Sequence, residues 1–240
     1  NFDYMCYHYS LTKKQEEIMK IIQAEWEMPF EPIYHINGFD LPLMPVITMQ
    51  QPEKVQGYSW GLIPHWVATL SEAQKIRTQT LNAKAETLFE KASFKSYISS
   101  RRCLVLADGF FEWMDFQKKK YPHYVHLNDN EMFAFAGIYS HWTDKETGEL
   151  FRTFSIITSD ANSLMARIHN MKKRMPVILD QSQWQAWLNP SLIKEQILKM
   201  LSPYPDETMR AYSISKLITT RGADTNVPQI KEPFSYPELL

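Results

Sequence analysis

The fold is indicated most clearly by the stretch RCLVLADGFFEW, which spans residues 102–113. It begins with an apolar, β-branched run typical of a buried strand, and similar runs follow at 132–139 and 151–158. The polar segments 118–120 and 144–148 have the composition of turns. Sequential strands joined by short turns predict an antiparallel sheet meander.

Helices are predicted around these strands. Apolar residues recur at helical spacing between Leu11 and Trp26, with Ser10 or Thr12 available as an N-cap. Segments 160–168 and 182–188 also predict helices, the second with two tryptophans on one face.

Prolines disfavour helix in two other segments. Residues 30–50 contain three interior prolines and are expected to form irregular strands with turns. Residues 209–214 predict a further strand, and the proline-rich end of the chain predicts an extended tail packed on the surface. Sequential strands with peripheral helices predict an α+β fold, a single domain whose antiparallel sheet is curled or barrel-like.

Composition narrows the class of protein. The 240 residues are 44% hydrophobic, which supports a substantial core, and no run of about 18 apolar residues suggests a membrane span. The N-terminus has no secretory signal pattern, so we expect a cytoplasmic protein without a membrane partner. The net charge of −1 gives no whole-protein argument for nucleic acid, so any such footprint must be local. Basic residues gather at Lys84, Lys91, Lys95, Arg101 and Arg102, and again at Lys172, Lys173 and Arg174.

The chain has two cysteines, Cys6 and Cys103, and we expect both to be free thiols. Cys6 is the candidate nucleophile, although an intracellular cysteine is more often a small buried hydrophobe. Cys103 lies within the apolar run that follows Arg102 and is assigned to the core.

Polar residues at three places in the sequence could take part in chemistry. Glu112 lies among aromatic residues after an apolar strand, so desolvation should raise its pKa, which suits acid–base work; a structural ion pair is the alternative. His169 precedes a basic segment and is either catalytic or a satisfied structural group. His123 and His126 resemble a metal pair, but a three-residue offset on a strand places them on opposite faces, so we expect no metal and no cofactor.

Four motifs carry a family resemblance. They are WGLIPHW at 60–66, NAKAET at 82–87, the stretch at 102–113, and Ile168-His169 with RMPVIL at 174–179. In this order they resemble the signature blocks of the SOS response-associated peptidase (SRAP) family, over residues from Met5 to about Pro233. Four motifs in register make the resemblance far more specific than any one of them.

The resemblance implies a protein of the DNA damage response that binds single-stranded DNA and links itself covalently to abasic sites. In the family the initiator methionine is removed to leave an N-terminal cysteine, and Met5-Cys6 is the matching pair. An α-amine with a pKa of about 8 is partly neutral at pH 7, so it can form a Schiff base with the aldehyde of the lesion. The thiol of the same residue then closes a thiazolidine ring in an intramolecular step. The product would shield the lesion.

The family's catalytic residues match Cys6, Asn82, Glu112 and His169. Asn82 would hold the cysteine through hydrogen bonds from its amide. Glu112 would transfer protons during sugar ring opening and imine formation, and His169 would assist. No cofactor, metal or obligate protein partner is implied, and we expect a monomer.

The family's DNA contacts match three further residues. Lys84 and Arg174 correspond to phosphate contacts. Trp113 corresponds to the aromatic residue that stacks beside the lesion, although a core tryptophan is the alternative.

The chain departs from the family pattern in three places. Tyr7-His8 stands where the family usually has Gly-Arg, so a basic DNA contact is missing or has become a pH-dependent histidine. Lys84 replaces an arginine, which keeps the charge but loses the bidentate fork. Four residues separate His169 from Arg174, more than the family carries.

Residues 1–4 precede Met5, so in the sequence as written Cys6 has no free amine. We expect translation to begin at Met5, with residues 1–4 being a cleaved leader or an addition from expression as the alternatives. The SRAP-like domain would then span residues 5–240.

Two other functions use the same residues. In a cysteine autopeptidase or thiol hydrolase, Cys6 would attack a peptide carbonyl with His169 as base and Asn82 as orienting or oxyanion group. That activity works with an internal cysteine, whereas thiazolidine formation needs the free amine. A non-catalytic single-stranded DNA module would instead show salt-sensitive binding that survives Cys6→Ala.

Overall fold

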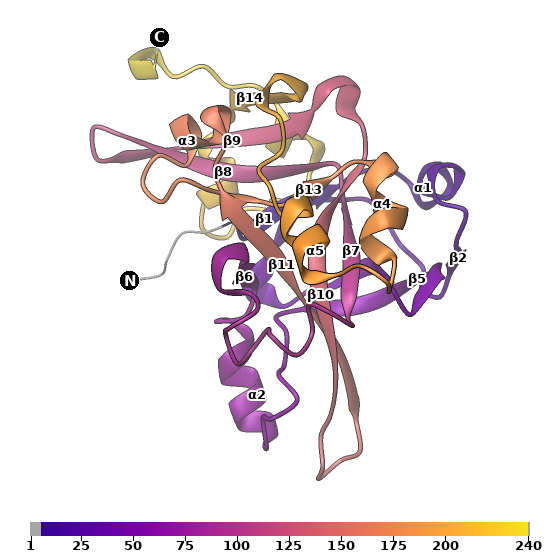
Figure 1. Cartoon of the computed structure of the whole chain (residues 1–240). Helices are drawn as coiled ribbons and strands as arrows, with labels where there is room; N and C mark the ends of the chain where they lie inside the picture. The colour runs from indigo at the N-terminus through magenta and orange to yellow at the C-terminus, as the bar shows by residue number, and fades with distance from the viewer. Residues whose placement is uncertain (1–5, 240) are drawn as a thin grey trace.

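The computed structural model describes residues 6–239 and contains two β-sheets surrounded by short helices (Figure 1). The first sheet has five antiparallel strands. In spatial order these are β14 (Met209–Ser213), β9 (Lys119–Leu127), β8 (Gly109–Phe116), β1 (His8–Leu11) and β3 (Ile33–Asn37).

The second sheet closes on itself. Its spatial order is β12 (Arg174–Pro176), β11 (Leu150–Asp160), β10 (Phe133–Thr143), β7 (Arg102–Ala107), β4 (Leu43–Thr48), β5 (Gln51–Trp60) and β2 (Glu25–Trp26), with β13 (Ile178–Leu179) on β10 and β6 (Asn82–Lys84) on β11. Because β11 also pairs in parallel with β5, strands β5, β4, β7, β10 and β11 form a closed ring. The predicted barrel-like sheet is therefore confirmed.

The helices lie outside the sheets (Figure 1). The α-helices are α1 (Gln15–Ile21), α2 (Leu70–Arg77), α3 (Ser163–Ile168), α4 (Gln181–Leu188) and α5 (Lys194–Met200). Short 3-10 helices lie at η1 (Gly38–Asp40), η2 (Ala85–Thr87), η3 (Asn128–Asn130), η4 (Asp206–Thr208), η5 (Lys216–Thr219), η6 (Pro228–Lys231) and η7 (Pro237–Leu239). The α+β class is confirmed, and no helix within residues 6–239 is long and apolar enough to cross a membrane.

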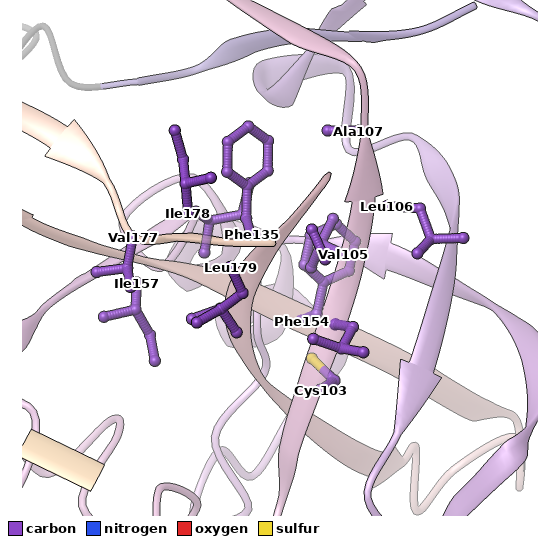
Figure 2. Close-up of a cluster of buried hydrophobic side chains, with 14 of the residues drawn as sticks. Cys103, Val105, Leu106, Ala107, Phe135, Phe154, Ile157, Val177, Ile178 and Leu179 are labelled. Atoms are coloured by element: carbon purple, nitrogen blue, oxygen red, sulfur yellow. The ribbon is translucent and has the colours of Figure 1, made fainter. Parts of the chain in front are cut away.

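Apolar side chains from the strands of the closed ring form a buried cluster (Figure 2). Figure 2 shows the Cys103 side chain within this cluster, together with Val105 from the same strand and Phe154 from β11. Burial raises the pKa of the Cys103 thiol well above its usual range, so the thiol stays neutral. The assignment of Cys103 to the core is confirmed, and both cysteines are free thiols, as predicted.

The helix predicted between Leu11 and Trp26 is shorter than expected. The two expected capping residues are used elsewhere, because the hydroxyls of Ser10 and Thr12 donate to Asp108 at 2.6 and 2.7 Å. The Thr12 amide donates to the same carboxylate, so the backbone stays extended and α1 begins only at Gln15. The far end of the predicted helix is also wrong, because Trp26 lies in β2.

The predicted meander is only partly correct. β7 pairs antiparallel with β10 and β10 with β11, but the intervening β8–β9 hairpin belongs to the other sheet. Gly109 opens β8 where the chain crosses between sheets. A Cβ atom there would lie 2.1 Å from the Tyr124 hydroxyl oxygen, so only glycine permits this approach. Along β8, Phe110 faces the main core, whereas Phe111 faces a second cluster.

Other predicted elements are confirmed. The segment 30–50 holds β3 and β4, and α3, α4 and β14 lie within or beside their predicted ranges. The C-terminal segment covers the outer face of the first sheet, where Ile218 and Ile230 pack near Phe111. It is less extended than predicted, since it contains η6 and η7.

Arg102 is not part of a basic surface. Its side chain is fully buried and donates hydrogen bonds to four backbone carbonyls, those of Trp187 at 2.9 Å, Ile98 at 2.9 Å, Ser99 at 2.9 Å and Asn189 at 2.6 Å. The sequence placed it in a basic cluster because an arginine at a strand end gives no local sign of the carbonyls that surround it. Its role is structural.

Candidate active site

Cys6 is separated by Tyr7 alone from the start of β1, the fourth strand of the first sheet. Its side chain is buried, and its backbone carbonyl accepts a hydrogen bond of 3.1 Å from Nδ2 of Asn82. Asn82 opens β6, which runs parallel to β11, and its own Oδ1 has no hydrogen-bond partner among residues 6–239. The two sheets thus meet at a contact between Asn82 and the backbone of Cys6.

Glu112 reaches the same place from β8. This strand pairs with β1, with Phe111 opposite His8, and the Glu112 side chain is only 3% exposed. Its carboxyl group shares a hydrogen bond with the Cys6 thiol and accepts another from the amide of Trp113. Burial raises the pKa of Glu112, and these interactions together with the charge of His169 only partly oppose that effect. Its Oε1 has no hydrogen-bond partner within the described part of the chain.

The Cys6 thiol is a weak acid in this setting. Burial raises its pKa well above the usual range, and the Glu112 carboxylate adds to the effect. The positive charge of Arg174 acts in the opposite direction without cancelling it. The thiol is therefore protonated at neutral pH while Cys6 stays enclosed.

His169 joins this cluster from the end of α3. It caps that helix, is 3% exposed, and donates a hydrogen bond from Nδ1 to the carbonyl of Arg174 at 2.9 Å. The four residues before Arg174 form an anchored turn, because Asn170 bonds the amide of Asp115 at 3.0 Å and its carbonyl at 2.7 Å. Despite the longer spacing to Arg174, the charge of His169 therefore still acts on the Glu112 carboxyl group.

Arg174 lies at the edge of the cluster, in a network of acidic groups. Its guanidinium contacts Glu86 at 2.7 and 3.0 Å, Asp160 at 2.9 Å and the carbonyl of Thr158 at 2.7 Å. Hydrogen bonds from Arg174 lower the pKa of Glu86, although burial acts in the other direction. Only Nε of Arg174 has no partner among residues 6–239. A phosphate bound here would compete with Glu86.

The other two predicted DNA contacts lie outside the Cys6–Glu112 cluster. Lys84 is exposed at the end of β6, opposite Thr158 of β11. Trp113 is half-buried and packs with the outer cluster of the first sheet, on the opposite face of β8 from Glu112. Both assignments stay predictions.

The sequence missed a histidine pair next to this site. His8 and His35 share a hydrogen bond of 2.9 Å, and their rings stack with centroids 5.1 Å apart. Burial lowers the pKa of His8 to about 3 and that of His35 to about 4, so both are neutral at physiological pH. With a pKa this low, His8 does not change its charge near neutral pH in this structure. A pair 27 residues apart leaves no local signal.

His123 and His126 lie on opposite faces of β9, as predicted. His123 is opposite Glu112, whereas His126 stacks on Tyr124 with centroids 5.7 Å apart. Across residues 6–239, no three His, Cys, Asp or Glu side chains gather closely enough to hold a metal ion.

Comparisons with known proteins place the chain in a family. The model of the SOS response associated peptidase (SRAP) family matches residues 5–221. A protein named abasic site processing protein YoqW, from Bacillus subtilis, is 34% identical over 233 residues, which cover 95% of this chain and 99% of that protein. The chain belongs to the SRAP family.

Two other similarities extend this result. Abasic site processing protein HMCES of Xenopus tropicalis is 30% identical over 186 residues, covering 69% of this chain and 54% of that protein. A crystal structure of a protein from Bacteroides thetaiotaomicron superposes with a TM-score of 0.90 at 40% identity, covering 96% of this chain and 100% of that one. The fold of this chain therefore matches that crystal structure over nearly its whole length.

Proposed function

We propose that this protein captures abasic sites in single-stranded DNA as a covalent thiazolidine formed by the backbone nitrogen and the thiol of Cys6. Relatives that match most of the chain are named abasic site processing proteins, which supports the choice of lesion. Residues 5–240 would act as one domain and as a monomer. Residues 1–5 lie outside the described structure, and the proposal requires their removal so that Cys6 becomes N-terminal.

The observation that carries this proposal is the way Cys6 is held. Asn82 binds its carbonyl oxygen at 3.1 Å, and the Glu112 carboxyl group contacts its thiol. Anchoring through the carbonyl leaves the nitrogen and the sulfur of the same residue to react with one carbon atom. A thiazolidine needs both atoms, and holding them in one place gives the second bond a high effective concentration.

The reaction balances with the groups present. The neutral amine adds to the aldehyde carbon of the open sugar, and the resulting carbinolamine loses water to give an imine. Loss of hydroxide as water leaves the imine protonated; sulfur then bonds to its carbon, the C=N electron pair becomes the lone pair of nitrogen, and the thiol proton passes to the carboxylate that gave up its proton. Glu112, with a raised pKa, would donate the proton that lets hydroxide leave as water. His169, which is electrostatically coupled to Glu112, would assist this transfer.

DNA binding would be local and mostly electrostatic. Lys84 is exposed, and Arg174 could exchange its contact with Glu86 for a phosphate. His8 is neutral and would add no positive charge to this surface. Trp113 would offer an edge or face to an unpaired base.

The test is to express the chain from Met5, confirm Cys6 at the N-terminus by mass spectrometry, and incubate it with an oligonucleotide containing an abasic site. We expect an adduct that survives denaturation. Cys6→Ser should give at most a weak, hydrolysable imine, whereas Cys103→Ala, which removes the buried thiol outside the site, should still form the adduct. Absence of the adduct with the processed protein, or a stable adduct with Cys6→Ser, would rule out the thiazolidine.

A further inference from the structure

His123 is the cross-strand neighbour of Glu112. The two residues are directly opposite in the antiparallel β8–β9 pair, and the next inward pair, Phe110 and Val125, packs in the main core. Residues opposite each other in such a pair point to the same face, with Cβ atoms about 5 Å apart. His123 therefore faces the same interior as the carboxyl group of Glu112.

The tautomer of His123 is set by its backbone. Its Nδ1 lies 2.9 Å from the carbonyl oxygen of Tyr121, and because a carbonyl only accepts, Nδ1 carries the hydrogen. Nε2 is then a hydrogen-bond acceptor. The side chain is 9% exposed, and burial lowers its pKa, so the ring is neutral at physiological pH.

The buried carboxyl group of Glu112, in turn, needs a hydrogen-bond acceptor. Its Oε1 is buried without a partner among residues 6–239, and a protonated carboxyl group there requires an acceptor for its hydrogen. We propose that His123 is a positioning residue for Glu112, with Nε2 accepting the carboxyl hydrogen through one bridging water molecule and so retaining the acid form that the lesion chemistry uses. The catalytic meaning rests on the proposed function, but the hydrogen bond itself does not.

Other charged and titratable groups act on Glu112 from each side. Lys120 on β9 and His169 after α3 favour its carboxylate form, and the Cys6 thiol donates to it. On the far side of His123, β14 places the uncharged Ser213 directly opposite. Of the neighbours on the first sheet, His123 offers an acceptor nitrogen on the same face as Glu112.

The first test uses NMR on the folded chain without DNA. Nitrogen-15 shifts of the wild-type histidines should show the Nδ1–H tautomer at His123; an Nε2–H tautomer would overturn the proposal without any variant. A carbon-13 titration should then place the pKa of Glu112 about one unit lower in His123→Phe than in wild type, since a hydrogen bond to the acid form is lost. Glu112→Gln assigns the signal.

Matched variants complete the design. His123→Gln retains an acceptor and should restore most of the shift, and His126→Phe, on the opposite face of β9, should leave Glu112 unchanged. A pKa of Glu112 that stays constant or rises in His123→Phe would refute the hydrogen bond.

The second test follows adduct formation against pH. The pH–rate profile of adduct formation should contain a limb that is absent in Glu112→Gln and therefore reports the ionisation of Glu112. In His123→Phe this limb should move about one pH unit lower, with DNA affinity unchanged. If that limb does not move, His123 does not act through Glu112. If wild type itself forms no adduct, the proposed function fails, whereas the NMR measurement still decides the hydrogen bond.

Discussion

Replacing Glu112 by glutamine should stabilise the fold at neutral pH and lose that advantage in acid. Burial raises the pKa of Glu112 above its ordinary value of 4.5, so the folded chain binds this proton more tightly than the unfolded chain. The contribution to wild-type stability is therefore complete below pH 4.5 and is lost as the pH rises through the folded-state pKa. Glutamine cannot ionise and escapes that loss.

The pH dependence of the difference in unfolding free energy follows from the binding of one proton. Between pH 4.5 and the folded-state pKa of Glu112, the difference in unfolding free energy between Glu112→Gln and wild type should grow by about 1.4 kcal/mol per pH unit. Above the folded-state pKa the difference should level off. A constant offset from the altered contacts with Cys6 and Trp113 does not affect the slope.

The assay is urea unfolding of both proteins at half-unit steps from pH 4 to pH 8, with the difference plotted against pH. Glu86→Gln is the control, because hydrogen bonds from Arg174 lower the pKa of Glu86 despite its partial burial. That variant should be less stable than wild type by a constant amount above pH 4.5, and the deficit should shrink only as the pH falls below 4.5, which is the opposite sign. A flat difference for Glu112→Gln would show that Glu112 ionises normally and would remove the basis for its acid role.

Three further predictions follow from single contacts. Asn82→Ala should slow adduct formation about 10- to 100-fold, because Cys6 loses the bond to its carbonyl; single-turnover crosslinking with DNA affinity measured in parallel tests this, and an unchanged rate would exclude a positioning role. Glu86→Gln should release Arg174 for a phosphate contact, so single-stranded DNA should bind more tightly and the slope of log K against log salt should become steeper by about 0.7. Fluorescence anisotropy over a salt series measures this slope, and a slope equal to that of wild type would contradict the prediction. Arg102→Lys should lower the unfolding free energy by about 2–4 kcal/mol, since one ammonium cannot reach four carbonyls; a loss of thermal stability within error of zero would refute it.

The strands were predicted where local pattern carries the information. β7 lies in the closed ring with both faces buried, and a strand of that kind has a continuous apolar run that any sequence window detects. β8 was not predicted as a strand because its residues alternate between two different clusters, so Glu112 and Trp113 break the apolar pattern. The same alternation explains why β8 carries the site: one face points into the core and the other outward.

The site depends on contacts that local pattern does not encode. Asn82 and Cys6 are 76 residues apart and meet only because β6 joins the edge of β11 beside β1. Cys6 was a candidate nucleophile on its own, but nothing in its segment marks Asn82, and only the family motifs paired the two residues. His123 shows the converse case, since the sequence singled out the residue as a poor metal ligand while its actual neighbour, Glu112, depends on the β8–β9 register.

The state of the Cys6 thiol separates the two covalent mechanisms. A thiol hydrolase needs a thiolate at the first step, whereas burial and Glu112 both raise the pKa of this thiol. Amine-first capture uses the sulfur only after the imine has formed. In the proposed mechanism Glu112 would by then have given its proton to the departing hydroxyl and left a protonated imine, so the carboxylate that contacts the thiol could accept the thiol proton as sulfur attacks. A single buried carboxyl group would thus act as acid and then as base, so a protonated resting thiol would suit capture of an aldehyde and oppose peptide hydrolysis.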